Sequence, residues 1–112
     1  NNHKENGFIE PIHYWEINPG IGQIVKIPET FSSELKNHFF ITSLSGSTDK
    51  DGSYKGESLY LVNFNKNFDD IESIDRLYVG ERIRDIIYDE KINGFLIAME
   101  NTSSIGYVSL LN

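Results

Sequence analysis

The sequence contains no cysteine among its 112 residues. Disulfide frameworks, thiolate zinc sites and cysteine nucleophiles are therefore excluded. It also lacks any apolar run approaching the roughly 18 residues of a membrane-spanning helix, and it shows no signal-like N-terminal stretch. Basic residues are few, with 10 Lys and Arg against 17 Asp and Glu, for a formal net charge of −7. An acidic chain without a basic stripe argues against nucleic acid and anionic membranes as its main partners.

Alanine is nearly absent too, since it occurs only at position 98. By contrast, the chain holds fifteen Ile, four Val and four Thr. Alanine is the strongest helix former, whereas β-branched residues prefer strands. Hydrophobic residues make up 38% of the chain and aromatic residues 12%, which suffices for a packed core. The composition therefore predicts an all-β protein.

Seven short strand-like segments follow a polar N-terminal stretch. The expected strands are 22–27, 39–44, 58–64, 73–79, 83–89, 94–99 and 104–111. Turn signals separate them, including Pro19-Gly20, Asp51-Gly52 and Asn93-Gly94. Only residues 30–36 suggest a helical turn. The pattern thus predicts a succession of antiparallel hairpins.

The grouping of these strands, four and then three, favours β-propeller blades, each a four-stranded meander of about 40–50 residues. We expect a polar segment or linker at residues 1–9, one full blade at 10–80, and a partial last blade at 81–112. A propeller needs at least about four blades, so this interpretation predicts a C-terminal piece of a longer protein. The first residue, Asn rather than Met, agrees with that expectation. A stand-alone seven-stranded sandwich fits the same pattern, and both remain open.

Three stretches carry a further signal when they are taken in order. They are EPIHYWEINPGIG at 10–22, FFITSLSG at 39–46, and GERIRDI at 80–86, the last followed by NGFLI and GYV. Together they resemble the C-terminal part of the glucose/sorbosone dehydrogenase family, which comprises six-bladed propeller enzymes that use pyrroloquinoline quinone (PQQ) and calcium. The motif Arg-x-Arg-Asp-(Ile/Val) in the third stretch is the most characteristic.

The resemblance implies an activity for the parent protein. Family members oxidise an aldose at its anomeric carbon and pass the electrons through PQQ to a separate acceptor, while calcium polarises the quinone. The implied partners are the remaining propeller blades, a sugar and an electron acceptor, and the implied location is periplasmic or secreted. The family's catalytic histidine and calcium ligands lie in earlier blades. His3, His13 and His38 therefore receive no such role, and this chain alone is not expected to be catalytic.

Arg82 and Arg84 are the residues to which the resemblance assigns cofactor binding. PQQ is a planar tricarboxylate, and the guanidinium fork matches a carboxylate well. Positions i and i+2 of a strand share a face, so both side chains can serve one site. The alternative is an exposed ion-pair network with Glu81, Asp85 or Asp89, of the kind that contributes little to stability.

The sequence also departs from the family pattern. Ser45 stands where the family commonly has a lysine, and the insertion at 47–57 carries Lys50 and Lys55. A Thr-Asp pair of the last blade is matched only loosely by Met99-Glu100. Ser45 in place of the lysine favours the alternative function, a non-catalytic β-propeller binding or scaffold module of the same family. The intact Arg-x-Arg-Asp motif favours the dehydrogenase.

Two other patterns suggest sites at first sight. Asp49–Ser53, with Glu57 beyond, resembles a calcium loop, but Ser47 and Ser58 would stand at its first and last ligand positions. We expect an acidic hairpin there instead. The run His13-Tyr14-Trp15 could stack on a sugar, although such clusters more often pack in a core, and we expect packing.

Overall fold

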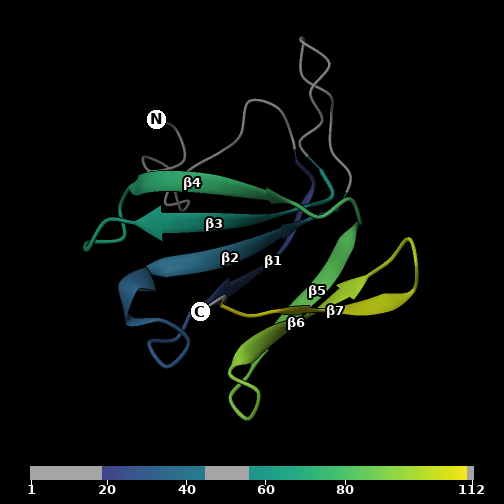
Figure 1. Cartoon of the computed structure of the whole chain (residues 1–112). Helices are drawn as coiled ribbons and strands as arrows, with labels where there is room; N and C mark the ends of the chain where they lie inside the picture. Colours follow the sequence, from purple (N-terminus) through teal and green to yellow (C-terminus); the bar gives the residue numbers. More distant parts are fainter. Residues whose placement is uncertain (1–18, 45–55, 111–112) are drawn as a thin grey trace, which may run out of the picture.

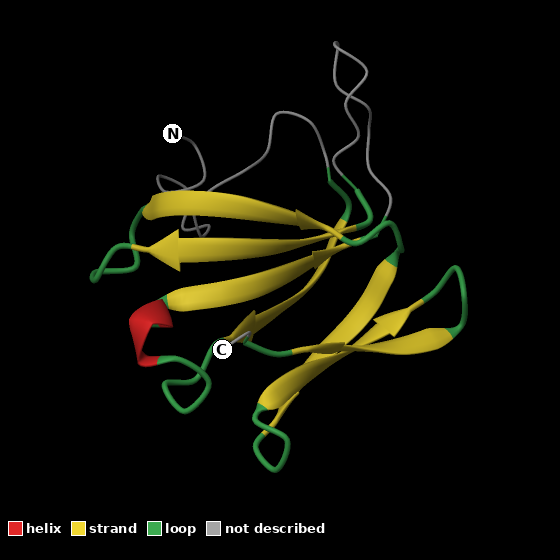
Figure 2. Cartoon of the chain, in the orientation of Figure 1, coloured by secondary structure: helices red, strands yellow, loops and turns green. Residues whose placement is uncertain are grey.

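The computed structural model describes residues 19–44 and 56–110, and within them the chain is all-β (Figures 1 and 2). The strands are β1 (Ile21–Lys26), β2 (His38–Ser43), β3 (Ser58–Phe64), β4 (Ile71–Tyr78), β5 (Ile83–Asp89), β6 (Gly94–Met99) and β7 (Ser104–Val108). A short 3-10 helix, η1 (Ser33–Leu35), lies between β1 and β2. No helix in the described residues is long and apolar enough to cross a membrane.

The seven strands form two open antiparallel sheets. The first has the order β1-β2-β3-β4 and the second the order β5-β6-β7. The predicted all-β class, the seven strands and their division into four and three are confirmed. Two boundaries differ by more than one residue. β4 begins at Ile71 rather than Ser73 because Ile71 pairs with Phe64 across the β3–β4 turn, and β7 ends at Val108 rather than Leu111.

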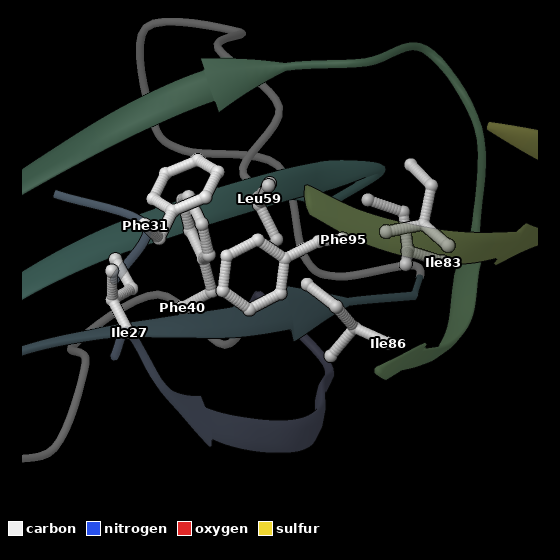
Figure 3. Packing of buried hydrophobic residues seen from close by; sticks show 8 residues of the cluster. Ile27, Phe31, Phe40, Leu59, Ile83, Ile86 and Phe95 are labelled. Carbon is white, nitrogen blue, oxygen red and sulfur yellow. The ribbon is translucent and has the colours of Figure 1, made fainter. Parts of the chain in front are cut away.

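The core lies between the two sheets, which approach most closely where β5 passes β1 and β2. Phe95 of β6 is fully buried, and its ring centroid lies 5.0 Å from those of both Phe31 and Phe40 (Figure 3). Ile83 and Ile86 of β5 enter the same cluster. Alternation along β6 directs Phe95 inward, as the pleat of a strand requires, whereas the register shift between Ile83 and Asp85 brings both Ile83 and Ile86 of β5 to the core. The core therefore fixes the start of β5 against the first sheet.

Both sheets also carry apolar side chains on the face that points away from this core. On the second sheet, Ile87 is 53% exposed, Ile105 76% and Tyr107 55%. On the first sheet, a separate cluster buries Ile41, Tyr60 and Val62, with partly buried neighbours such as Phe64. Each sheet is thus apolar on two faces rather than one.

Candidate functional site

Arg82 and Arg84 lie at the start of β5. Arg82 immediately precedes the strand, and its backbone is held on both sides: its N–H donates to Asn101 Oδ1 at 3.1 Å, and its carbonyl accepts from the Glu100 N–H at 2.9 Å. The pairing of β5 with β6 shifts register between Ile83 and Asp85. Arg84 stands in this irregularity, where a strand changes the direction of its side chains.

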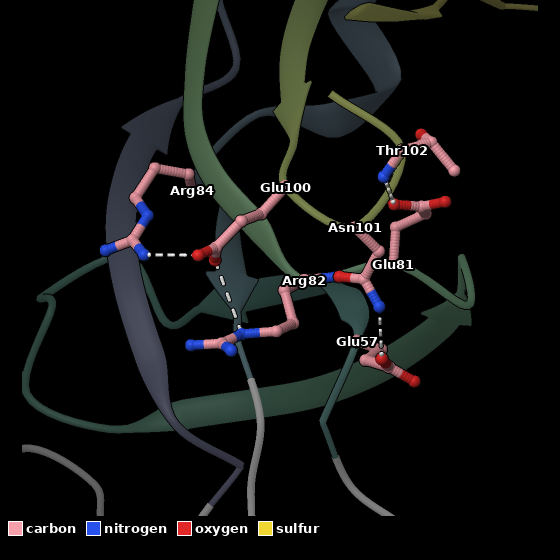
Figure 4. Close-up of polar contacts among 7 residues, drawn as sticks. All are labelled: Glu57, Glu81, Arg82, Arg84, Glu100, Asn101 and Thr102. Atoms are coloured by element: carbon pink, nitrogen blue, oxygen red, sulfur yellow. Dashed lines mark hydrogen bonds and ion pairs between the residues drawn. The ribbon is translucent and has the colours of Figure 1, made fainter. Parts of the chain in front are cut away.

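The two guanidinium groups meet at one carboxylate, that of Glu100 in the turn after β6 (Figure 4). Arg84 Nη2 donates to Glu100 Oε1 at 2.9 Å, and Arg82 Nε lies 3.3 Å from Glu100 Oε2. The two side chains therefore meet at one carboxylate, although Arg82 precedes β5 and Arg84 lies in the irregularity of the strand, so they are not neighbours on one regular strand face. The family pattern matches Glu100 only loosely and assigns it no role, and the position of Glu100 beside the arginines follows from the pairing of β5 with β6.

The alternative ion-pair network, with Glu81, Asp85 or Asp89, is wrong in its partners. The carboxylates of these three residues accept backbone N–H groups instead. Glu81 Oε1 accepts from Thr102 at 3.2 Å, Asp85 Oδ1 from Ile86 at 2.8 Å, and Asp89 Oδ1 from Lys91 at 2.9 Å. These three carboxylates thus accept hydrogen bonds from nearby backbone groups. The ion pairs of Arg82 and Arg84 form with Glu100 instead.

The arginine pair retains capacity to bind a ligand. The side chains of Arg82 and Arg84 are 40% and 57% exposed, and that of Glu100 is 37% exposed. Arg82 Nε is itself buried, and its contact with Glu100 lacks hydrogen-bond geometry. Among the described residues, Glu100 is the only partner of either guanidinium. Two cations and one anion leave the cluster with a net charge of about +1 on an acidic protein.

A second layer of contacts holds the turn that carries Glu100. Asn101 Nδ2 donates to Glu57 Oε2 at 3.3 Å, while the Glu57 carbonyl accepts the N–H groups of Val79 and Gly80 at 3.1 and 3.0 Å. Gly80 has φ +81°, which a residue with a side chain rarely adopts. Through Glu57, these hydrogen bonds join the segment Val79-Gly80, which links the two sheets, to the turn beside Arg82 and Arg84.

Several predicted features lie outside the described residues. These are Ser45 and the lysines Lys50 and Lys55, the acidic loop Asp49–Ser53, the aromatic run His13-Tyr14-Trp15, and His3. His38 is described, and its Nδ1 lies 2.8 Å from the carbonyl oxygen of Lys36. In residues 19–44 and 56–110, no group of three or more His, Asp or Glu side chains could hold a metal ion.

Arg76, the remaining arginine, has a different environment. Its Nε donates to Ser58 Oγ at 2.8 Å, its Nη2 donates to the Gly56 carbonyl at 3.1 Å, and its guanidinium lies over the Tyr78 ring. Tyr60 stands opposite it on β3, and burial raises the pKa of this phenol although the nearby Arg76 charge partly offsets the effect. Arg76 is thus engaged by fixed protein groups.

Comparisons with protein-family models, with curated proteins and with solved structures found no match for this chain.

Proposed function

We propose that this chain supplies two adjacent blades near the C-terminus of a six-bladed β-propeller of the glucose/sorbosone dehydrogenase type. In this proposal Arg82 and Arg84 contact the carboxylates of PQQ. The parent protein would oxidise an aldose at its anomeric carbon, use calcium, deliver electrons to a separate acceptor, and act in the periplasm or outside the cell.

The arrangement of the two sheets supports the propeller. β1 and β5, the first strand of each sheet, lie close together, while the last strand of the first sheet leads by a short link into β5. Blades around a central axis are related in this way. A two-sheet sandwich instead turns polar faces outward, whereas both sheets here are apolar on two faces. These doubly apolar sheets are the observation that carries the propeller assignment.

The arginine cluster supports the carboxylate ligand. It lies at the start of β5, the strand nearest the neighbouring sheet, and two guanidiniums there retain N–H donors. Guanidinium and carboxylate form charge-assisted, often bidentate hydrogen bonds. The residues present therefore fit the acidic groups of PQQ. When bound, that cofactor supplies the hydride acceptor, and Arg82 and Arg84 bind and orient it.

One observation favours the second candidate, a non-catalytic binding or scaffold propeller. Glu100 already engages both arginines, so the pair is partly neutralised within the protein. A decayed cofactor site would retain such ion pairs as surface structure. The two candidates differ in whether an added polycarboxylate binds at Arg82 and Arg84.

Titration of the longest polypeptide containing this sequence with PQQ, in the presence of calcium, tests the proposal. Each lost charge-assisted hydrogen bond costs about 1.5–3 kcal/mol, so the double variant Arg82→Ala/Arg84→Ala should bind at least about 100-fold more weakly. The matched control, Lys66→Ala/Lys91→Ala, removes two positive charges from exposed turns and should bind normally. Absence of binding by the folded wild type would contradict the cofactor assignment and favour the scaffold.

A further inference from the structure

We infer that β7 is an interaction edge that binds a second copy of this chain. Two β7 strands pair antiparallel across a two-fold axis and join the three-stranded sheets of both copies into one continuous sheet. The inference goes beyond the proposed function, because it concerns the open side of β7 and not the arginine pair. In a closed propeller a strand of the parent protein takes this place, so the dimer is expected of the 112-residue chain by itself.

The outer side of β7 is an unprotected sheet edge. β7 pairs with β6 on one side, and in the described part of the chain no strand pairs with it on the other (Figure 1). Alternate residues of an edge strand direct N–H and C=O groups outward, where another chain can pair with them. β4, the outer strand of the first sheet, carries Glu72, Asp75 and Arg76, whereas β7 carries no charge. A second copy therefore meets no like charge along β7, although the whole chain has a net charge of −7.

The sequence of β7 is self-complementary about its central residue, Gly106. With the two-fold axis at Gly106, all five residues of the strand are paired, and Ile105 of each copy lies opposite Tyr107 of the other. Both side chains are exposed on the outer face of the sheet, and cross-strand pairs of a β-branched and an aromatic residue stabilise a sheet. The symmetry forms this favourable pair twice.

The core face of the strand also suits the axis. A Cβ built on Gly106 would lie 3.0 Å from Ile97 Cγ1 and from Met99 Cε, so these two side chains of β6 cover the glycine. The absence of a side chain at position 106 therefore prevents crowding where the two strands meet at the axis.

The rest of the fold leaves this edge accessible. The first sheet contacts the second mainly through β5, which lies two strands away from β7. A five-residue strand pair gives an interface smaller than the roughly 800 Å² per partner of a standard stable complex. The dimer should therefore be weak, with a dissociation constant on the order of 10 µM.

Two double variants test the register, because both lose the same two apolar side chains. Ile105→Lys/Tyr107→Lys places lysine opposite lysine twice in the dimer, whereas Ile105→Lys/Tyr107→Glu places each lysine opposite a glutamate. Like charges directly opposite destabilise a strand pair, so in sedimentation velocity the second variant should dimerise at least about tenfold more tightly. Overall charge cannot produce this order, because the first variant is closer to neutral. Dimerisation of equal strength in the two variants overturns the inference.

Amide hydrogen exchange of the wild type locates the interface without any substitution, and it decides the matter should the variants fail to fold or to associate. Alternate N–H groups of β7 should exchange about threefold more slowly at about 200 µM than at about 2 µM. The edge N–H groups of β4 are the internal control and should not change. Association without protection of β7 would mean that the sheets meet face to face, and it overturns the inference. A chain that is monomeric at both concentrations overturns it as well.

Discussion

Arginine occurs three times in this chain, and the surroundings of each side chain distinguish its role. Arg76 is bound to two fixed oxygens and lies over an aromatic ring. Arg82 and Arg84 share one carboxylate and extend into solvent. Partly exposed ion pairs contribute only about 0–1 kcal/mol to stability. The ion pairs of Arg82 and Arg84 with Glu100 should therefore contribute little to the stability of the fold.

The burial of the Tyr60 side chain makes the free energy of unfolding depend on pH. Burial raises the pKa of its phenol above the ordinary value of 10.0, and the neighbouring Arg76 charge and hydrogen bond lower it in part. The folded chain therefore retains this proton to a higher pH than the unfolded chain. The stabilising contribution is fully present below pH 10.0 and is lost as pH rises through the folded-state pKa.

The free energy of unfolding should accordingly fall above about pH 10 in the wild type. Tyr60→Phe should remove this part of the decline. Urea unfolding followed from about pH 8.5 to 11 measures both slopes. Parallel slopes in the two proteins would show that Tyr60 does not make this contribution.

At the scale of the elements, Gly94 of β6 lies directly against the Tyr107 ring of the neighbouring strand β7. A Cβ built on Gly94 would overlap Cε1 of the Tyr107 side chain. The Tyr107 hydroxyl donates to the Ile92 carbonyl at 3.1 Å, in the turn between β5 and β6. The absence of a side chain at position 94 therefore lets the ring lie across the strand and hold the turn.

Gly94→Ala should displace the Tyr107 ring and break its hydrogen bond, at a cost of about 1–2 kcal/mol in the free energy of unfolding. In a Tyr107→Ala background the ring is already absent, and the same change should cost less. A double-mutant cycle by urea unfolding should give a coupling of at least about 0.5 kcal/mol. Additive effects would contradict the proposed contact.

The strand pattern itself was largely predictable. The boundaries of β3, β5 and β6 agree with the prediction because regular alternation and turn residues mark them locally. β4 was placed two residues late, since Ile71 joins the strand through its pairing with Phe64 directly after the turn at residues 65–70, and β7 was predicted three residues too long. Non-local pairing of this kind overrides weak local propensity.

At the scale of the whole molecule, an apolar sheet face remains uncovered. Ile87, Ile105 and Tyr107 lie on the outer face of the second sheet, and β7 forms the edge of that sheet without a charged residue. Natural proteins usually protect such edges with charges or proline. The propeller proposal requires another blade to cover this face.

The 112-residue chain alone should therefore self-associate at micromolar concentration. Ile87→Lys/Ile105→Lys should reduce the association, because it places charges on the exposed face. Asn67→Lys is the control, since it adds a charge in the exposed turn between β3 and β4, on the first sheet. Sedimentation velocity over a concentration series measures the effect. A 12.8 kDa monomer with sharp cooperative unfolding would count against the propeller.

The sequence by itself determined the β class, the seven strands, and the presence of two guanidiniums at the start of the fifth strand. These features depend on short-range alternation and on side-chain chemistry. Only the tertiary structure decided that Glu100 is their partner, that β5 lies against β1, and that both sheets have two apolar faces. Such features depend on strand register and on sheet packing, which join residues far apart in the chain and therefore leave no local signal.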